Sequence, residues 1–245
     1  MATLLLRCVA PLQAWDTQSR FGVRTTGREP SKSGIVGLLC AALGRPRQEP
    51  VTDLAALNMA VRVDQEGSLL RDFHTAQNVL KAGGGTKDTE VSTRYYLSDA
   101  AFLVALAGDL ALLQQLHAAL RDPRWMLCLG RKSCPPSRPV YIPADQWDWE
   151  ADWRALFETF PWLGTMPRQY DRLGDKVRIV FDDDDGPPVR HDQPISFEKG
   201  RRQFAPRRVK TDFINKPPLN PDLTGVENPD LTGVENLSGL DTKET

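Results

Sequence analysis

The chain has 245 residues, of which 40% are hydrophobic and 26% are charged, enough for one substantial core or two small ones. Its four cysteines form no Cys-x-x-Cys motif, which argues against a zinc site and favours a reducing compartment. No apolar stretch reaches the length of a membrane span, and Arg7 interrupts the leucine run that begins at Leu4. We therefore expect a cytoplasmic protein that binds no membrane.

The net charge of −1 conceals an uneven distribution along the chain. Residues 211–245 contain seven acidic and two basic residues, so residues 1–210 carry a net charge of +4. The segment 199–210 holds six basic residues and no acidic one. A basic cluster of this kind indicates a polyanionic partner.

The N-terminal part of the chain predicts a strand, a helix and a second strand. Residues 3–10 read as a largely buried strand. The apolar positions from residue 33 to 43 follow helical spacing, with a serine available as the cap and Gly44 at the end. Residues 57–63 alternate between polar and apolar side chains, as a strand does.

The next part repeats this order after a long excursion. Residues 64–98 are polar, carry three glycines at 83–85, and are too long for an ordinary connection, which is typical of a functional loop or a mobile segment. We then predict a strand at 100–107, a helix from 109 to about 120, and a short strand at 125–129. The order βαββαβ predicts an α+β domain of ferredoxin-like topology, which RNA-recognition (RRM-like) domains also use.

The rest of the chain has fewer regular patterns. The acidic run 182–185 predicts an exposed turn rather than a metal site, because consecutive carboxylates rarely converge on one ion. An octapeptide at 220–227 repeats at 228–235, and its composition predicts disorder. Six aromatic residues could cover the core or a partner surface: Trp147, Trp149, Trp153, Phe157, Phe160 and Trp162. Three parts are therefore expected: a domain at 1–137, an irregular and β-rich C-terminal extension at 138–214, and a disordered acidic tail at 215–245.

The stretch 25–39 is similar to a phosphate-binding loop that leads into a helix. A P-loop needs a glycine directly before its lysine, and Ser31 stands before Lys32 here, which argues against nucleotide hydrolysis. The N–H groups at a helix start still favour a phosphate, and Arg24, Arg28 and Lys32 could add contacts. The alternative is a solvated basic loop that only caps the helix.

Two further basic segments carry similar chemistry. Residues 130–133 combine a glycine, two cations and a hydroxyl, although a simple surface turn is the alternative. The third segment is 199–210. Three separate basic segments suit the backbone of a nucleic acid better than one small ligand. Phe204, Tyr95 and Tyr96 could stack on unpaired bases or belong to the core.

Candidates for catalysis are few. The chain has only three histidines, His74, His117 and His191, and His117 falls within the second predicted helix, where we expect a structural or surface role. His74 lies in the long excursion near Asp72, which could orient it as the base of a ribonuclease, or it makes an ordinary loop hydrogen bond. No nucleophile–base pair or carboxylate pair stands out, and nothing in the sequence predicts a metal or a cofactor.

Several residue strings together resemble one known family. They are Leu12-Gln-Ala-Trp15, Arg24-Thr25, residues 30–39, Ala42-Leu-Gly44, Asp72-Phe-His-Thr75, residues 94–100, residues 129–135 and Arg202-Gln-Phe204. In this order they are similar to the CasD family of type I-E Cascade subunits, the fifth-numbered Cas family within the RAMP superfamily. Residues 146–195 match this family loosely, and the duplicated tail does not match it.

The resemblance implies a ferredoxin-like RAMP domain with a long β-hairpin thumb at 64–98, inserted between the second and third strands. It implies a subunit that caps the 5′ handle of CRISPR RNA (crRNA) and contacts the Cascade backbone subunit, the PAM-recognising large subunit and, indirectly, target DNA. The expected RNA contacts are Arg24, Thr25, Arg28, Ser31, Lys32, Ser33, Arg131, Lys132, Ser133, Arg201, Arg202, Gln203, Phe204, Arg207 and Arg208. The thumb residues expected to touch RNA or another subunit are His74, Thr75, Arg94, Tyr95 and Tyr96.

The predicted function is that of a non-catalytic RNA-binding subunit in an antiviral ribonucleoprotein complex. The first alternative is a metal-independent endoribonuclease that uses His74. The resemblance carries this alternative, because the type I-C relative cuts repeat RNA whereas type I-E systems use a separate subunit. The second alternative is an architectural subunit whose basic residues face proteins or target DNA.

Overall fold

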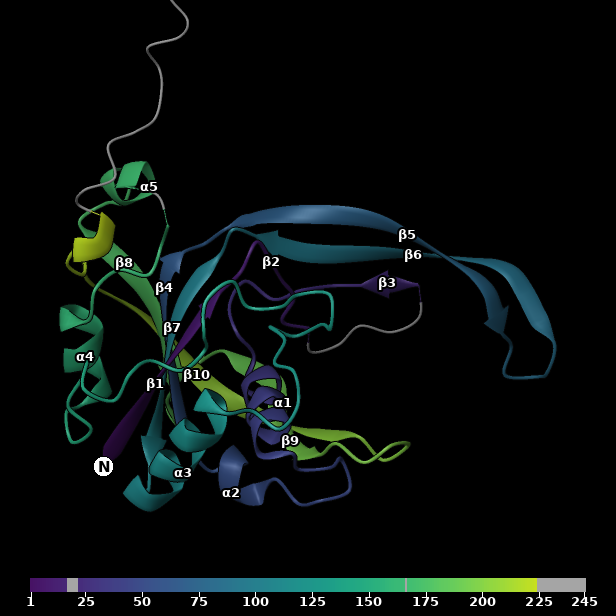
Figure 1. The fold of residues 1–245 in the computed structure, drawn as a ribbon, viewed down its shortest axis with the longest axis horizontal. Helices are drawn as coiled ribbons and strands as arrows, with labels where there is room; N and C mark the ends of the chain where they lie inside the picture. Colours follow the sequence, from purple (N-terminus) through teal and green to yellow (C-terminus); the bar gives the residue numbers. More distant parts are fainter. Residues whose placement is uncertain (17–21, 166, 224–245) are drawn as a thin grey trace, which may run out of the picture.

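The computed structural model describes residues 1–16, 22–165 and 167–223 (Figure 1). They form a mixed α/β structure that is mostly sheet. A six-stranded sheet with helices packed against it makes the body, and a long two-stranded hairpin extends away from it. No helix within these ranges is long and apolar enough to cross a membrane.

The six-stranded sheet is antiparallel throughout. Its order is β1 (Ala2–Val9), β7 (Ala101–Gly108), β4 (Asn58–Gln65), β8 (Lys176–Asp182), β10 (Gln203–Asn215) and β9 (Val189–Ser196). β1 and β7 are nearly continuous apolar runs because almost every side chain in them is buried. The predicted strands at 3–10, 57–63 and 100–107 are confirmed, with ends that differ by one or two residues.

Two helices of the prediction are confirmed, α1 (Lys32–Leu43) and α3 (Leu110–Arg121), and they pack against each other (Figure 1). Ser31 caps α1, Gly44 ends it with a left-handed φ of 71°, and Asp109 caps α3. The shorter helices are α2 (Thr52–Ala55), α4 (Trp153–Thr159), α5 (Pro167–Asp171) and the 3-10 turn η1 (Pro221–Leu223).

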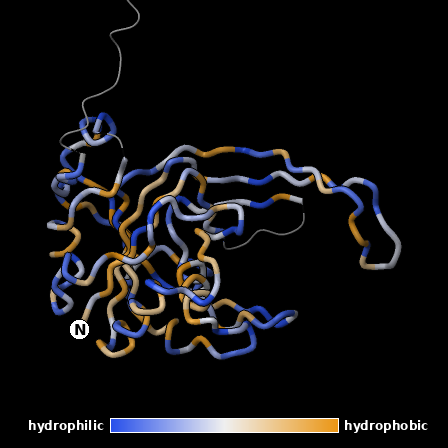
Figure 2. Tube along the Cα trace, in the orientation of Figure 1, coloured by the Kyte–Doolittle hydropathy of each residue, from blue (hydrophilic) through white to orange (hydrophobic). Residues whose placement is uncertain are grey.

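A hairpin of β5 (Ser68–Leu80) and β6 (Thr86–Ser98) occupies the predicted excursion between β4 and β7. Gly84 and Gly85 at its tip have φ values of 89° and 75°, which glycine adopts without steric cost. Two short N-terminal strands, β2 (Leu12–Gln13) and β3 (Val23–Arg24), pair with the other edge of β6. Figure 2 shows apolar segments gathered in the body and a mixed pattern along the hairpin.

The predicted strand at 125–129 is wrong, because these residues are irregular. Backbone N–H groups at the start of this segment satisfy the last carbonyls of α1 instead of forming a sheet ladder. The N–H of Arg124 donates to the Ala42 carbonyl at 2.9 Å, and that of Trp125 donates to the Ala41 carbonyl at 3.1 Å. The segment is therefore fixed to the end of a helix.

Residues 140–149 cover the free edge of β1, where the fourth strand of the prediction would lie. The Arg7 N–H donates to the Val140 carbonyl and the Thr3 N–H donates to the Trp149 carbonyl, both at 2.8 Å. Core packing accounts for most of the aromatic group in the extension, since four of its members are buried: Trp147, Phe157, Phe160 and Trp162. His117 has the expected structural role, with Nε2 2.8 Å from the Ile142 carbonyl oxygen.

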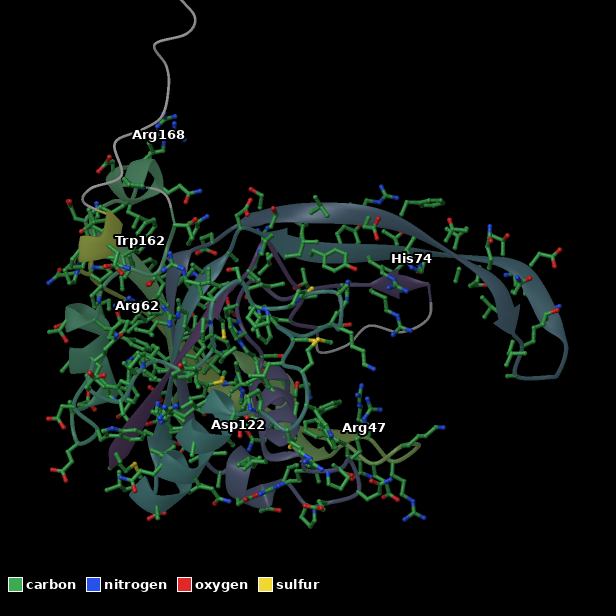
Figure 3. All side chains as sticks on the ribbon, in the orientation of Figure 1. Arg47, Arg62, His74, Asp122, Trp162 and Arg168 are labelled. Atoms are coloured by element: carbon green, nitrogen blue, oxygen red, sulfur yellow. The ribbon has the colours of Figure 1, made fainter. Side chains whose placement is uncertain are left out.

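A buried ion pair joins the extension to the sheet. The side chains of Arg62 and Asp64 on β4 are both 0% exposed, and the Arg62 guanidinium also donates to the Phe160 and Pro161 carbonyls. The indole of Trp162 donates to the Asp64 carbonyl at 2.7 Å, and Figure 3 shows Arg62 and Trp162 on the same side of the body. Residues 224–245, which hold most of the predicted tail, lie outside the described residues.

Candidate nucleic-acid interface

A groove of about 740 Å³ lies along α1 and brings together residues from all three predicted basic segments. Its floor contains Gly34, Gly37 and Ala41, which are spaced three and four residues apart and so share one face of the helix. The walls come from the N-terminal segment, β6, the 125–132 segment and the extension. The predicted site residues that line it are Arg24, Ser31, Ser33, Arg94, Arg131, Lys132, Arg202 and Phe204.

The groove carries a strong excess of positive charge. Seven basic residues line it against one carboxylate, that of Asp16. Arg45 is bound to Asp53 through two hydrogen bonds of 2.6 and 2.8 Å. Within the described ranges, no ion pair involves the other six, which are Arg24, Arg47, Arg94, Arg131, Lys132 and Arg202. Cations gathered without counter-charges suit a polyanion.

Arg131 holds the central position in this cluster because the chain turns sharply just before it. Gly130 has a φ of 92°, and a Cβ there would lie 1.7 Å from the Ala14 carbonyl oxygen, so only glycine fits. The Arg131 guanidinium donates to the carbonyls of Tyr95, Arg24 and Thr25 at 2.9 to 3.1 Å. One side chain therefore ties the hairpin base to the N-terminal segment.

Tyr96 is the buried support beneath these cations. The Arg131 guanidinium carbon lies 4.8 Å from the centre of its ring. Burial alone raises the pKa of the Tyr96 hydroxyl, but interactions with Ser133, Arg131 and Arg94 outweigh burial and lower it below its ordinary value. Three predicted residues thus converge on the phenol of a fourth, Tyr96.

β3 places Arg24 beside Arg94. Strands β3 and β6 run parallel, with Val23 opposite Thr93 and Arg24 opposite Arg94. The Thr93 N–H donates to the Gly22 carbonyl at 2.8 Å. Like charges on neighbouring strands repel each other. An anion in the groove would relieve that repulsion.

The start of α1 differs from the predicted phosphate site, because a carboxylate of the protein already occupies it. The Lys32 backbone N–H donates to Asp192 Oδ2 at 2.8 Å, and its ammonium group binds Asp182 at 2.9 Å. Arg207 binds both Asp182 and Asp192. Lys32 and Arg207 therefore direct their charges into the protein, and Asp182 belongs to this cluster rather than to the predicted exposed turn.

Other predicted residues lie outside the groove. Arg28 lines a second cavity of about 760 Å³, beside Glu29, whose carboxylate binds Arg178 and Arg190. Arg208 donates to the Gly186 carbonyl at 3.2 Å. The remaining ones away from the groove lining are Thr25, Ser133, Arg201, Gln203, Thr75, Tyr95 and Tyr96.

His74 lies on the hairpin (Figure 3) and does not line the groove. It faces Ser92 across the strand pair, while Asp72 faces Arg94. Its Nδ1 atom is buried and has no hydrogen-bond partner among the described residues, so the expected orienting contact with Asp72 is not made. The catalytic arrangement considered from the sequence is therefore not assembled here.

Sequence reasoning missed several groove residues: Arg45, Arg47, Trp125, Met126 and Phe197. The basic string Arg45-Pro-Arg47, which follows the cap of α1, could have identified Arg45 and Arg47 as candidate anion-binding residues. The strand predicted at 125–129 gives no sign that Trp125 and Met126 are exposed.

Residues 3–210 match the family described as CRISPR-associated protein (Cas_Cas5), so the chain belongs to this family. Over 156 residues it is 36% identical to the CRISPR system Cascade subunit CasD of Escherichia coli (strain K12), covering 57% of this chain and 69% of that protein.

Two solved structures are similar over most of their length. One, described as a crystal structure of a Cas protein, has a TM-score of 0.70 and 42% identity, covering 89% of this chain and 99% of that chain. The other, described as a CRISPR RNA-guided surveillance complex, has a TM-score of 0.73 and 31% identity, covering 87% and 90% respectively. The predicted family is therefore confirmed.

Proposed function

We propose that this chain is a Cascade subunit in CRISPR defence that holds the single-stranded 5′ handle of crRNA in the groove along α1. The observation that carries the proposal is the convergence of six cations from five separate segments of the chain, none of which has an acidic partner among the residues that the structure describes. Arg side chains bind phosphate through paired N–H donors, and single strands are commonly held by cations beside aromatic rings. Similarity to a Cascade subunit and to a surveillance complex supports this role.

The groove itself gives the most direct test. A Cβ built on Gly37 meets no atom within 4 Å, so Gly37→Leu would fill the groove without disturbing the core. We expect at least a tenfold loss of affinity for handle RNA with no loss of thermal stability, since leucine favours a helix over glycine. Gly174→Leu is the matched control, because its Cβ also meets nothing and it lies outside the groove lining. Equal binding by Gly37→Leu and the wild type would contradict the proposal.

The finer description of the fold is part of this proposal. The strand order β1-β7-β4 with α1 and α3 supports a ferredoxin-like RAMP domain at 1–137, and the β5–β6 hairpin is the counterpart of the thumb. Leu69, Phe73 and Val91 are exposed on one face of this hairpin. That face would contact the backbone subunit or the PAM-recognising large subunit. The chain would then interact with target DNA only indirectly, through the other parts of the complex. The complex would act in the cytoplasm.

We also propose that the role is non-catalytic. The position of His74 outside the groove, without a partner for Nδ1, supports binding over cleavage. Purified protein should leave repeat RNA uncut, and His74→Ala should change nothing. Site-specific cleavage that this substitution abolishes would establish the endoribonuclease alternative instead.

A further inference from the structure

The end of the groove near the C-terminus of α1 is chemically different from the end near its N-terminus. Trp15 and Ser31 mark the N-terminal end, where Arg24, Arg94 and Arg131 cluster. At the other end the lining includes Trp125 and Met126, residues that are 47% and 72% exposed. Arg45 and Arg47 line the same end.

The backbone of Trp125 is anchored to the end of α1, although the residue is exposed. Its backbone N–H bonds the Ala41 carbonyl, and the preceding N–H of Arg124 bonds the Ala42 carbonyl. The Arg124 side chain also packs over Gly44, where a Cβ would lie 2.5 Å from its Cγ. The anchored backbone thus presents an indole in a cationic groove, and only its side chain remains to be ordered when a ligand binds.

We propose that Trp125 is a base-stacking platform for one unpaired nucleobase of the bound RNA, with Met126 extending the apolar surface. This inference rests on the proposed function: the cations of the groove suit a polyanion, and an exposed indole beside them suits a polyanion that carries planar bases. The small residues Gly37 and Ala41 leave room for a base beside the indole. The phosphates would then lie against the arginine cluster at the other end.

Stacking and phosphate binding have different signatures in salt. Loss of a stacked base should lower affinity by about 5- to 150-fold, a range that corresponds to the usual stacking contribution. The slope of log affinity against log salt should stay unchanged, because no phosphate contact is lost. Replacement of a groove arginine should instead reduce that slope.

The test measures binding of fluorescein-labelled handle RNA to full-length wild type, Trp125→Ala, Trp125→Phe and Phe213→Ala at several salt concentrations. Phe213 is an exposed aromatic residue of β10 outside the groove lining, so its replacement controls for loss of an exposed ring. We expect Trp125→Ala to bind weakly with an unchanged slope, and the other two variants to bind like the wild type. RNA with a single abasic site at the stacked position should bind wild type and Trp125→Ala equally.

Two outcomes would overturn the inference. If the wild type binds handle RNA and Trp125→Ala binds it equally well, the stacking platform is refuted while the proposed function stands. If the wild type itself does not bind the RNA, both fall together. Matching thermal unfolding curves for the variants would show that any loss of binding is not a loss of the fold.

Discussion

The salt dependence of RNA binding follows directly from the charges in the groove. Seven basic residues line it, and Arg45 is already bound to Asp53, which leaves six whose charge no carboxylate neutralises among the described residues. Each phosphate contact of a single strand contributes about −0.7 to the slope of log affinity against log salt, so the full groove predicts about −4. Raising salt from 50 to 200 mM should then weaken binding about 300-fold.

Arg24 and Arg94 are the informative pair to replace, since β3 places them side by side. The double variant Arg24→Gln/Arg94→Gln should reduce the slope to about −3, and the same salt increase should then weaken binding only about 50-fold. The control is the double variant Arg168→Gln/Arg172→Gln, which removes the same amount of charge. Arg168 lies in α5 and Arg172 directly follows it, both outside the groove lining, so this variant should keep the wild-type slope. Figure 3 shows Arg168 far along the body from Arg47.

The measurement is fluorescence anisotropy of a labelled handle RNA across a salt series. Parallel lines for the groove variant and the wild type would refute the assignment of these two arginines. A wild-type slope near zero would refute the electrostatic groove as a whole. A reduced slope in the α5 variant would show that net charge, rather than position, governs binding.

Three further predictions concern the scaffold that positions the groove. Gly34→Ala should destabilise the fold, because its Cβ would lie 2.9 Å from the Trp15 ring, whereas Gly37→Ala should stabilise it by about 0.5–1 kcal/mol. Asp64→Asn should cost about 3–5 kcal/mol, because it leaves the buried Arg62 charge unpaired. Burial by itself would raise the pKa of Glu29, but Arg190 and Arg178 outweigh burial, so the net pKa in the folded protein is lower than usual. The ionised carboxylate of Glu29 therefore stabilises the fold above pH about 4.3, and this contribution is lost as the pH falls through the lowered pKa of the folded state.

Chemical and thermal denaturation check these three predictions. Equal stabilities for Gly34→Ala and Gly37→Ala would refute the close packing of Trp15. Asp212→Asn removes a largely exposed ion pair with Arg154 and should cost much less than Asp64→Asn, so a similar cost for the two variants would contradict the role of burial. Glu29→Gln should be less stable than the wild type at pH 7 and approach it at low pH, and a constant difference would refute the assigned pKa direction.

Local patterns predicted much of the scaffold. The apolar spacing and caps of α1 and α3 identified both helices to within two residues, because Ser31, Gly44 and Asp109 satisfy orphan backbone groups nearby in sequence. The segment at 125–129 was mistaken for a strand because its apolar residues resemble one. Its backbone partners are the carbonyls at the end of α1, which no local pattern reveals.

The candidate site was predictable as a set of basic segments but not residue by residue. Lys32 and Arg207 look like surface cations in sequence, yet Asp182 and Asp192 neutralise them within the protein. Lys32 and Asp192 are 160 positions apart, so only the folded chain brings them together. Arg131 is the opposite case. Gly130 and Lys132 beside it mark a candidate phosphate-binding turn in the sequence, and Arg131 lines the groove.

Photocrosslinking locates the RNA strand most directly. Handle RNA with a photoreactive nucleotide at each position in turn, bound to the full-length chain and irradiated, should form adducts within 24–47, 125–132 and 202–204. Residues of all three segments line the groove. Adducts confined to the hairpin face of Leu69 and Phe73, or no adducts under conditions in which the RNA is bound, would contradict the account.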